Sequence, residues 1–181
     1  MQGVSIRPAT VQDAPAVARI HWDSWVATYG SVFPQAMFDE FPLAQREDIW
    51  SRDAARHGDP TLRRQLLVAA AGERLVGFAS VGPYRLQDSD DPAAAPDGEL
   101  FAIYLDPALQ RKGIGRALWQ ASSAWLQSAG FEAFRLWCID GNAAEAFYRA
   151  MGAQCVAHRN FDAHGRQLGE NCYRAATRES C

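Results

Sequence analysis

The segment from Glu99 to Gly130 constrains the fold more strongly than any other part of the chain. Residues 100–105 read Leu-Phe-Ala-Ile-Tyr-Leu without polar alternation, which is typical of a strand buried on both faces. Pro107 has no backbone N–H and cannot continue a central strand, so we expect the strand to end near Asp106. A loop containing glycine follows, and then a helical pattern that Gly130 can end. The residues expected on the buried face of that helix are Ile114, Leu118, Ala121 and Trp125.

The loop Gln110-Arg-Lys-Gly-Ile-Gly115 indicates an anion-binding site. Gly113 and Gly115 lack a Cβ, so the backbone can turn tightly and bring its N–H groups close to a ligand. The first N–H groups of the following helix have no partner within the helix, and the helix dipole adds positive charge there. Phosphate is the natural ligand of such a site. The alternative is a tight turn with solvated basic side chains. The cations beside the helix start are Arg111, Lys112 and Arg116.

Two other phosphate-binding motifs fit the loop less well. A P-loop requires Gly-Lys-Ser/Thr, whereas Lys112 here precedes Gly113. The dinucleotide fingerprint requires a third glycine where this chain has Leu118. A protein that binds a nucleoside triphosphate or a dinucleotide is therefore an alternative that this loop supports less well.

The composition suits a soluble globular protein. A length of 181 residues fits one domain, 1–181, with its own core, and the net charge of −3 argues against general nucleic-acid binding. The apolar runs are too short to span a membrane, and residues 1–7 do not resemble a secretory signal. The cysteines show no metal-ligand spacing, so we expect reduced thiols in the cytoplasm and no metal. They are Cys138, Cys155, Cys172 and Cys181.

Hydrophobic periodicity and turn residues predict the remaining elements. Strands are expected at 4–7, 66–70, 75–81, 134–139, 156–161 and 167–174, and helices at about 10–28, after 34, at about 43–56, and between Asn142 and Gly152. Asn142 can cap the last helix while Glu145 reaches back to it. The connection 83–98 is expected to be a solvated loop, and the alternative is an acidic flap over a cationic acceptor. Its acidic residues are Asp88, Asp90, Asp91 and Asp97.

Aromatic residues are concentrated in the first helices and the turns between them. Trp25, Tyr29 and Phe33 are candidates for the wall of an acceptor pocket, and the alternative is that they belong to the ordinary core. His21 carries the same ambiguity between a satisfied histidine and a catalytic one. The full aromatic set is Trp22, Trp25, Tyr29, Phe33, Phe38 and Phe41.

The glycine loop after a strand that ends in Asp-Pro resembles the acyl-CoA-binding motif of the GNAT acyltransferase superfamily, and the order of elements extends the resemblance to most of the chain. It implies an α/β (α+β) fold: a mixed, twisted, mostly antiparallel sheet of about seven strands, with helices on both faces. Two central parallel strands would splay apart and hold acetyl-CoA in the gap. The cofactor-binding residues implied are Ile103, Tyr104, Leu105, Gln110, Arg111, Lys112, Gly113, Ile114, Gly115, Arg116 and Asn142.

The resemblance also implies catalytic roles. Tyr148 matches the family position of the acid that protonates the leaving thiolate, with a core tyrosine as the alternative. Glu99 is the best-placed carboxylate for a base acting through water, and the alternative is a polar strand-end residue. Relatives often have an asparagine seven residues before this tyrosine, whereas Asn142 lies six before Tyr148. The spacing leaves a coenzyme A contact by Asn142 open.

The function implied is an acetyl-CoA-dependent N-acetyltransferase that needs no metal. Its acceptor would be a primary amine of a small molecule or peptide, which attacks the thioester directly in a ternary complex. A non-catalytic acyl-CoA-binding or sensing module of the same fold is the alternative. Neither nucleic acid nor membrane is an expected partner, and a homodimer is compatible with this prediction.

Overall fold

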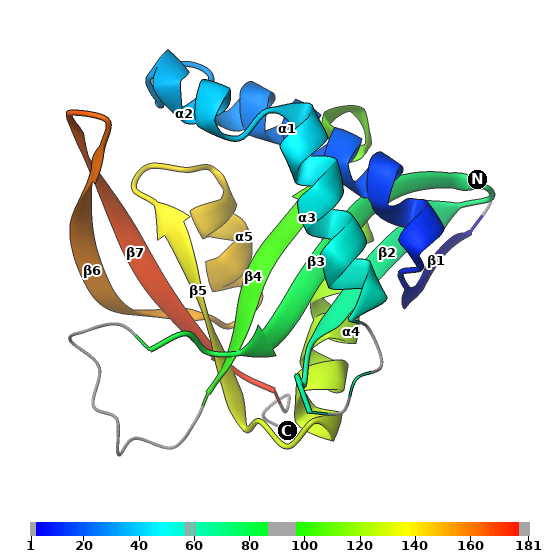
Figure 1. Ribbon diagram of the computed structural model, residues 1–181. Coiled ribbons are helices and arrows are strands. Elements are labelled where there is room, and N and C mark those ends of the chain that lie inside the picture. The colour runs from blue at the N-terminus through cyan, green and yellow to red at the C-terminus, as the bar shows by residue number, and fades with distance from the viewer. Residues whose placement is uncertain (1–2, 57–58, 60, 87–96, 178–181) are drawn as a thin grey trace.

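A computed structural model describes residues 3–56, 59, 61–86 and 97–177 (Figure 1). Seven strands form one sheet: β1 (Val4–Pro8), β2 (Gln65–Ala71), β3 (Arg74–Pro83), β4 (Gly98–Leu105), β5 (Ala133–Ile139), β6 (Gln154–Ala163) and β7 (Arg166–Ala176). The helices are α1 (Ala14–Tyr29), α2 (Gln35–Glu40), α3 (Leu43–Ala55), α4 (Ile114–Ser128) and α5 (Ala144–Ala150). Two short 3-10 turns, Val11–Asp13 and Pro107–Leu109, precede α1 and the glycine loop.

The order of strands in the sheet is β1-β2-β3-β4-β5-β7-β6. Every neighbouring pair is antiparallel except β4 and β5, which run parallel. The predicted sheet, mixed and mostly antiparallel with one central parallel pair, is therefore confirmed.

The parallel pair separates soon after it forms. β4 and β5 pair only at Gly98 with Phe134 and at Glu99 with Arg135. From Leu100 to Leu105 the edge of β4 that faces β5 has no strand partner in the described chain, and Figure 1 shows the two strands diverging toward α1 and α2. The predicted splaying is confirmed, and it leaves a wedge-shaped gap inside the sheet.

Helices cover both faces of the sheet, as predicted. On one face α4 and α5 pack over a core that includes Leu118, Leu126 and Phe134. On the other face α1 and α3 pack over a second core that includes Val17 and Phe78. The gap between β4 and β5 therefore lies between two packed layers (Figure 1). Among the described residues, no helix combines the length and the apolar character needed to cross a bilayer.

The buried face of α4 differs from the prediction. Ala121 and Trp125 are only partly buried, whereas a line of residues four apart is buried together with Trp119. Ser122 lies on that line. Because Ser122 is polar, the spacing of the apolar residues alone did not identify the buried face of the helix. The buried residues are Ile114, Leu118, Trp119, Ser122 and Leu126. Gly130 ends the helix as expected, with a φ of +87°.

The acidic connection is described only at its ends. Asp88, Asp90 and Asp91 lie outside the described residues. Asp97 is described, and the expectation that it belongs to a solvated loop is wrong. Its side chain is buried, and Oδ2 accepts hydrogen bonds from Arg135 Nε at 2.8 Å and Arg174 Nε at 2.9 Å. Two strands thus supply cations that compensate the buried carboxylate.

We expect Ser122→Ala to stabilise the protein. Ser122 is fully buried and its hydroxyl has no hydrogen-bond partner in the described structure, so alanine removes a desolvated polar group and favours the helix. The free energy of unfolding should rise by about 1 kcal/mol in urea titrations.

The neighbouring Ser123→Ala is the matched control. Ser123 Oγ donates a hydrogen bond to Thr177 O at 2.9 Å, so the same substitution there should lower the free energy of unfolding. Equal effects of the two substitutions would contradict this assignment of the hydroxyls.

Candidate functional site

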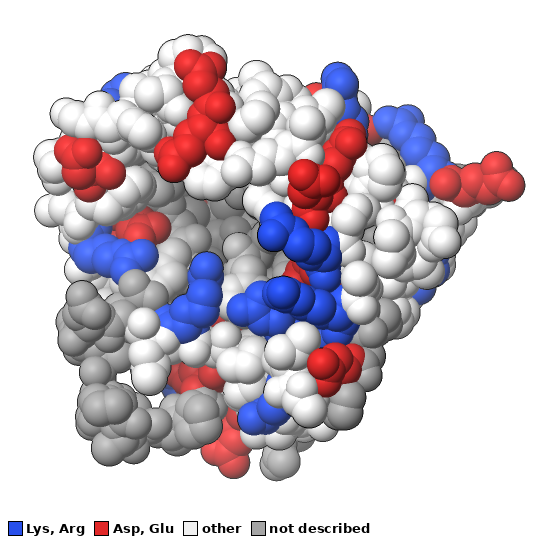
Figure 2. Space-filling model, in the orientation of Figure 1, with Lys and Arg blue, Asp and Glu red and all other residues white. Residues whose placement is uncertain are grey.

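The gap between β4 and β5 collects polar side chains from four elements. Tyr104 comes from β4, Cys138 from β5, Tyr29 from α1 and Tyr148 from α5. Each of Tyr104 and Cys138 helps to raise the pKa values of Tyr29 and Tyr148, so the four side chains lie near each other. In the same orientation as Figure 1, Figure 2 shows the surface hollowed below α2, over the region where the strands separate, with Lys and Arg side chains along its lower edge.

Burial keeps these groups protonated. It raises the pKa of Tyr104 to about 12 and that of the Cys138 thiol to about 12. Burial, followed by the proximity of Cys138 and Tyr104, also raises the pKa of Tyr148 well above its usual value. At neutral pH the gap is therefore lined by neutral groups that carry protons.

Tyr148 lies on α5 with its ring in an aromatic cluster. The ring centroids of Trp119 and Tyr173 lie 6.1 and 6.0 Å from that of Tyr148. The side chain is almost fully buried, yet its hydroxyl makes no hydrogen bond to any described residue. Its neighbour Tyr173 differs in this respect, since the Tyr173 hydroxyl donates to Glu145 Oε2 at 2.8 Å. The packing fixes the ring of Tyr148 and leaves its proton available.

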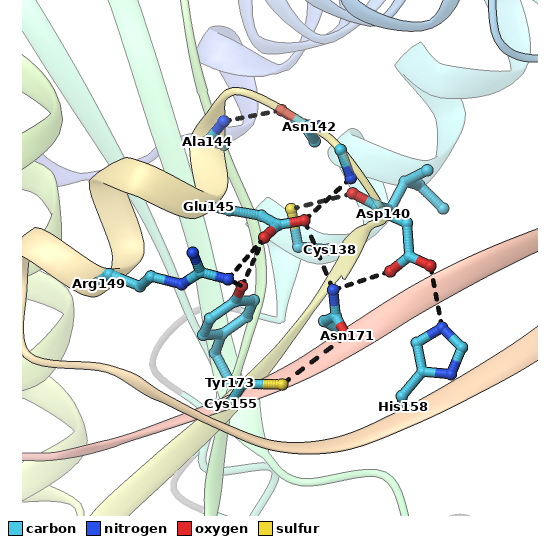
Figure 3. A network of polar contacts seen from close by, with 12 residues as sticks. Cys138, Asp140, Asn142, Ala144, Glu145, Arg149, Cys155, His158, Asn171 and Tyr173 are labelled. Atoms are coloured by element: carbon cyan, nitrogen blue, oxygen red, sulfur yellow. Dashed lines mark hydrogen bonds and ion pairs between the residues drawn. The ribbon is translucent and has the colours of Figure 1, made fainter.

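A polar network holds the start of α5 (Figure 3). Asn142 Oδ1 accepts from the backbone N–H of Ala144 at 2.9 Å, and Asn142 Nδ2 donates to the hydroxyl of Tyr29 at 3.0 Å. Glu145 Oε1 accepts from the N–H of Gly141 at 3.0 Å. The predicted capping pair is thus present in altered form: Ala143 occupies the N-cap, and Glu145 reaches Gly141 rather than Asn142.

The glycine loop leads directly into α4. Gly113 is the N-cap with a φ of +84°, and Arg111 before it also has a positive φ, of 63°. The first backbone hydrogen bond of the helix runs from Ala117 N to Gly113 O, which leaves the N–H groups of residues 114–116 without an acceptor in the described chain. Gln110, Arg111, Lys112 and Arg116 are all exposed beside these groups.

Gly115 lies close to the end of β4 and to α5. Its φ is not positive, and a Cβ there would make ordinary van der Waals contacts, 3.4 Å from Leu105 Cδ1 and 3.6 Å from the ring of Phe147. The loop thus lies at the open end of the gap, next to Leu105.

Glu99 lies where β4 and β5 still pair. Its side chain is buried, and Arg85 approaches both carboxylate oxygens: the backbone N–H donates to Oε2 at 2.9 Å and Nη2 donates to Oε1 at 2.5 Å. Nε lies 3.2 Å from Oε1 and 3.1 Å from Oε2. Three N–H groups of Arg85 therefore engage the two oxygens of this buried carboxylate.

Trp25, Tyr29 and Phe33, the residues predicted to form an aromatic wall, contact one another, but only Trp25 lines a pocket. The rings of Tyr29 and Phe33 stack with centroids 4.7 Å apart, and Trp25 lies 5.2 Å from Phe33. Trp25 lines a pocket of about 190 Å³ beneath α1 and α3. Tyr29 and Phe33 are not among its lining residues.

The same pocket contains residues that sequence reasoning did not assign. Arg46 and Trp50 of α3 line it together with His21 of α1. Arg46 lies on the buried face of α3, between Leu43 and Trp50, and a cation within an apolar stripe is the sequence signal that could have identified it. Trp50 Nε1 donates to His21 Nδ1 at 3.1 Å, so the histidine is held in one orientation.

The described residues contain no cluster of three or more His, Cys, Asp or Glu side chains able to hold a metal. Cys138 and Cys155 are free thiols, and Cys181 lies outside the described residues.

We expect His21 to contribute stability that disappears in acid. Burial, and then the charge of Arg46, lower the pKa of His21 from 6.5 to about 3. Between these values the unfolded chain binds a proton that the folded chain does not, so the contribution is complete above about pH 6.5 and is lost as the pH falls toward 3. The charged or titratable groups facing the ring are Arg46 and Tyr104.

Urea titrations at several pH values should show a steeper acid loss of stability in the parent than in His21→Gln. An imidazole signal of His21 that titrates near pH 6.5 in NMR spectra of the folded protein would contradict this prediction.

Comparison with known proteins gives consistent matches. The acetyltransferase (GNAT) family model matches residues 15–153. An uncharacterized N-acetyltransferase, YuaI of Bacillus subtilis strain 168, is 32% identical over 167 residues, covering 92% of this chain and 90% of that protein. The mycothiol acetyltransferase of Pseudarthrobacter chlorophenolicus is 31% identical over 155 residues, which cover 83% of this chain and 42% of that protein.

The fold has close structural counterparts. The PaiA N-acetyltransferase of Thermoplasma acidophilum, crystallised in complex with coenzyme A, superposes with a TM-score of 0.72 over 93% of this chain and 98% of that one, at 19% identity. This likeness concerns the fold. The family match over most of the chain and the identity to YuaI concern the sequence itself. The chain therefore belongs to the GNAT family of acetyltransferases.

Proposed function

We propose that this protein is an acetyl-CoA-dependent N-acetyltransferase whose acceptor is a primary amine of a small molecule or peptide. The observation that carries the proposal is the open edge of β4, which ends beside the unpaired N–H groups at the start of α4. An extended chain with amide groups can pair with such an edge, and a pyrophosphate can bind such a helix start. Acetyl-CoA has both parts in one molecule.

In this proposal the cofactor lies along β4 and leaves the gap at the glycine loop. Its pantetheine amides pair with the backbone of Ile103, Tyr104 and Leu105. Its pyrophosphate binds the N–H groups after Gly113, near exposed cations that would otherwise oppose the helix dipole. The residues assigned to the phosphates are Gln110, Arg111, Lys112, Gly113, Ile114, Gly115 and Arg116. The PaiA N-acetyltransferase, which shares this fold and was crystallised in complex with coenzyme A, supports coenzyme A as the ligand.

Asn142 is assigned a supporting role near the cofactor. Both polar atoms of its side chain already bond to Ala144 and Tyr29, so it shapes the turn before α5 and bridges α5 to α1. Any contact with coenzyme A is made in addition to these bonds. Acyl transfer at this site requires no metal.

The reaction is direct attack in a ternary complex. The amine nitrogen forms a bond to the thioester carbon while the carbon–sulfur bond breaks, and the departing thiolate takes the proton of the Tyr148 hydroxyl. A thiol has an ordinary pKa near 8.5, so it holds that proton at neutral pH. The Tyr148 hydroxyl has no hydrogen-bond partner among the described residues while its ring is packed in the core, and this supports its assignment as the acid. We assign Glu99 as the base that takes the amine's proton through water, in competition with the N–H groups of Arg85 that engage its carboxylate.

The thioester carbonyl needs polarising donors, and β4 can supply them. Ser80 of β3 pairs with Ala102 while Val81 pairs with Leu100, so Phe101 is an extra residue that forms a bulge. A bulge redirects backbone N–H groups away from the regular ladder. We assign the N–H groups of this part of β4 to the developing oxyanion.

The acceptor enters from the side of α1 and α3, where Trp25, Tyr29 and Phe33 form an aromatic wall. The mycothiol acetyltransferase among the relatives supports a small-molecule acceptor. The free thiols support a reducing compartment, and we propose that the whole chain, 1–181, works as a single domain in the cytoplasm. A non-catalytic acyl-CoA-binding module is the competing function.

We expect Tyr148→Phe to remove catalysis while leaving cofactor binding intact. The substitution deletes one hydroxyl without a protein partner and keeps the packed ring, so the melting temperature and its increase with acetyl-CoA should be unchanged. The kcat for thiol release with an amine acceptor should fall roughly a hundredfold or more, with little change in the KM for acetyl-CoA.

Tyr173→Phe is the matched control, because it removes a buried hydroxyl that bonds to Glu145. This variant should lose stability and keep most of its kcat. A Tyr148→Phe enzyme with the kcat of the parent across the pH range would show that another group supplies the proton. A parent protein that binds acetyl-CoA but releases no thiol with any amine would favour the non-catalytic module.

A further inference from the structure

Arg46 is a buried cation without a compensating anion. The residue is 3% exposed, and no described Asp or Glu lies within ion-pair distance of it. Its Nε donates to the backbone oxygen of Phe41 at 2.9 Å, and its Nη1 lies beside the ring of His21. Its Nη2 is buried and has no partner in the described structure. Buried charges are normally paired, so this guanidinium has an unused donor where an anion is expected.

The protonation of His21 adds a second unused donor. The low pKa keeps the ring neutral, and a neutral imidazole has one acceptor nitrogen and one N–H. Trp50 Nε1 donates to Nδ1 at 3.1 Å, so Nδ1 is the acceptor. The proton is then on Nε2, whose only nearby polar atom in the described chain is the donor Nη1 of Arg46, at 2.9 Å. Neither Nε2–H nor Nη2 has an acceptor among the described residues.

The surroundings of these two donors are apolar and aromatic. The guanidinium carbon of Arg46 lies 4.3 Å from the ring centroid of Trp25 and 5.4 Å from that of Trp22. Met37, Phe41 and Ile49 complete the lining of the pocket of about 190 Å³. A small group with two acceptor oxygens fits these donors, and an attached apolar group fits the walls.

Tyr104 lies between the pocket and the proposed reaction centre. The ring centroids of His21 and Tyr104 lie 4.9 Å apart, and Tyr104 belongs to the strand that borders the gap. Tyr104 is also near Tyr148, whose pKa it helps to raise. The donors of Arg46 and His21 are therefore one aromatic ring away from the gap, and an acceptor held by them has to pass the Tyr104 ring to reach the thioester.

We propose that Arg46 and His21 bind the carboxylate of the acceptor, and that the acceptor is an amino acid with an apolar side chain. The guanidinium and the imidazole N–H supply the donors for the two carboxylate oxygens, and the aromatic walls receive the side chain. The α-amino group then points toward the gap. This inference rests on the proposed acetyl transfer, because it names the acceptor class of that same site.

The first experiment compares acids with their amides in the absence of turnover. N-acetyl-L-leucine, N-acetyl-L-methionine and N-acetyl-L-phenylalanine are titrated against the parent protein with coenzyme A, next to the three corresponding primary amides. Quenching of tryptophan fluorescence reports binding, because Trp25 and Trp50 line the pocket. We expect at least one acid to bind at least tenfold more tightly than its amide. Equal binding within all three pairs, or no binding of any acid, overturns the proposal.

The second experiment uses variants of α3. Arg46→Met should abolish the preference for the acid while the affinity for the amide stays within about twofold, and Arg46→Lys should keep part of the preference. Arg52→Met is the matched control, because Arg52 is an exposed arginine on the same helix and should keep the full preference. A preference unchanged in Arg46→Met overturns the assignment.

Two further measurements distinguish a failure of the proposed carboxylate site from a failure of the proposed transferase function. If Arg46→Met does not fold by circular dichroism, the acid–amide comparison in the parent and in Arg46→Lys decides. Thiol release from acetyl-CoA with L-leucine, L-methionine, L-phenylalanine and their amides is measured in parallel. A preference for the acid without thiol release from any amine contradicts the proposed transferase function and supports the carboxylate site. Thiol release with equal kcat/KM for acids and amides supports the transferase and overturns the carboxylate site.

Discussion

The loss of pairing between β4 and β5 after two residue pairs is the feature on which the rest of the structure depends. Backbone N–H and C=O groups inside a sheet normally find partners, and leaving them unpaired away from water is costly. Here Tyr29 from one helical layer and Tyr148 from the other lie near each other at the gap. The same separation brings the free helix start of α4 to the end of the exposed edge. A ligand with a chain of amides and a pyrophosphate satisfies both sets of groups at once.

Tyr104 is the shared wall of the two parts of the site. It lies on β4, beside the gap assigned to the cofactor, and its ring faces His21 in the pocket under α1 and α3. The α4 and α5 layer supplies the helix start and Tyr148, to which we assign the cofactor and the chemistry. The α1 and α3 layer supplies His21 and Arg46, to which we assign the acceptor. In this proposal one layer carries out the reaction and the other determines which amine is accepted.

Local patterns predicted most of the elements, and long-range pairing explains the misses. The strand at 100–105, the glycine loop and the helix ends at Gly130 and Gly152 follow from residue type and spacing alone. Polar residues on buried faces could not be placed this way. Ser122 interrupts the buried stripe of α4, and Asp97 is buried only because Arg135 and Arg174 reach it from distant strands. The site was predicted through family resemblance, whereas Arg46 needed the packing of α3 against α1.

The most direct test of the account is backbone hydrogen exchange with and without acetyl-CoA. We propose that the open edge of β4 and the start of α4 both bind the same cofactor molecule. Acetyl-CoA should therefore slow exchange at residues 100–105 and 114–116 and leave β1 unchanged, and neither ATP nor NAD should reproduce the pattern. Slower exchange elsewhere with no change at residues 100–105 would contradict the account.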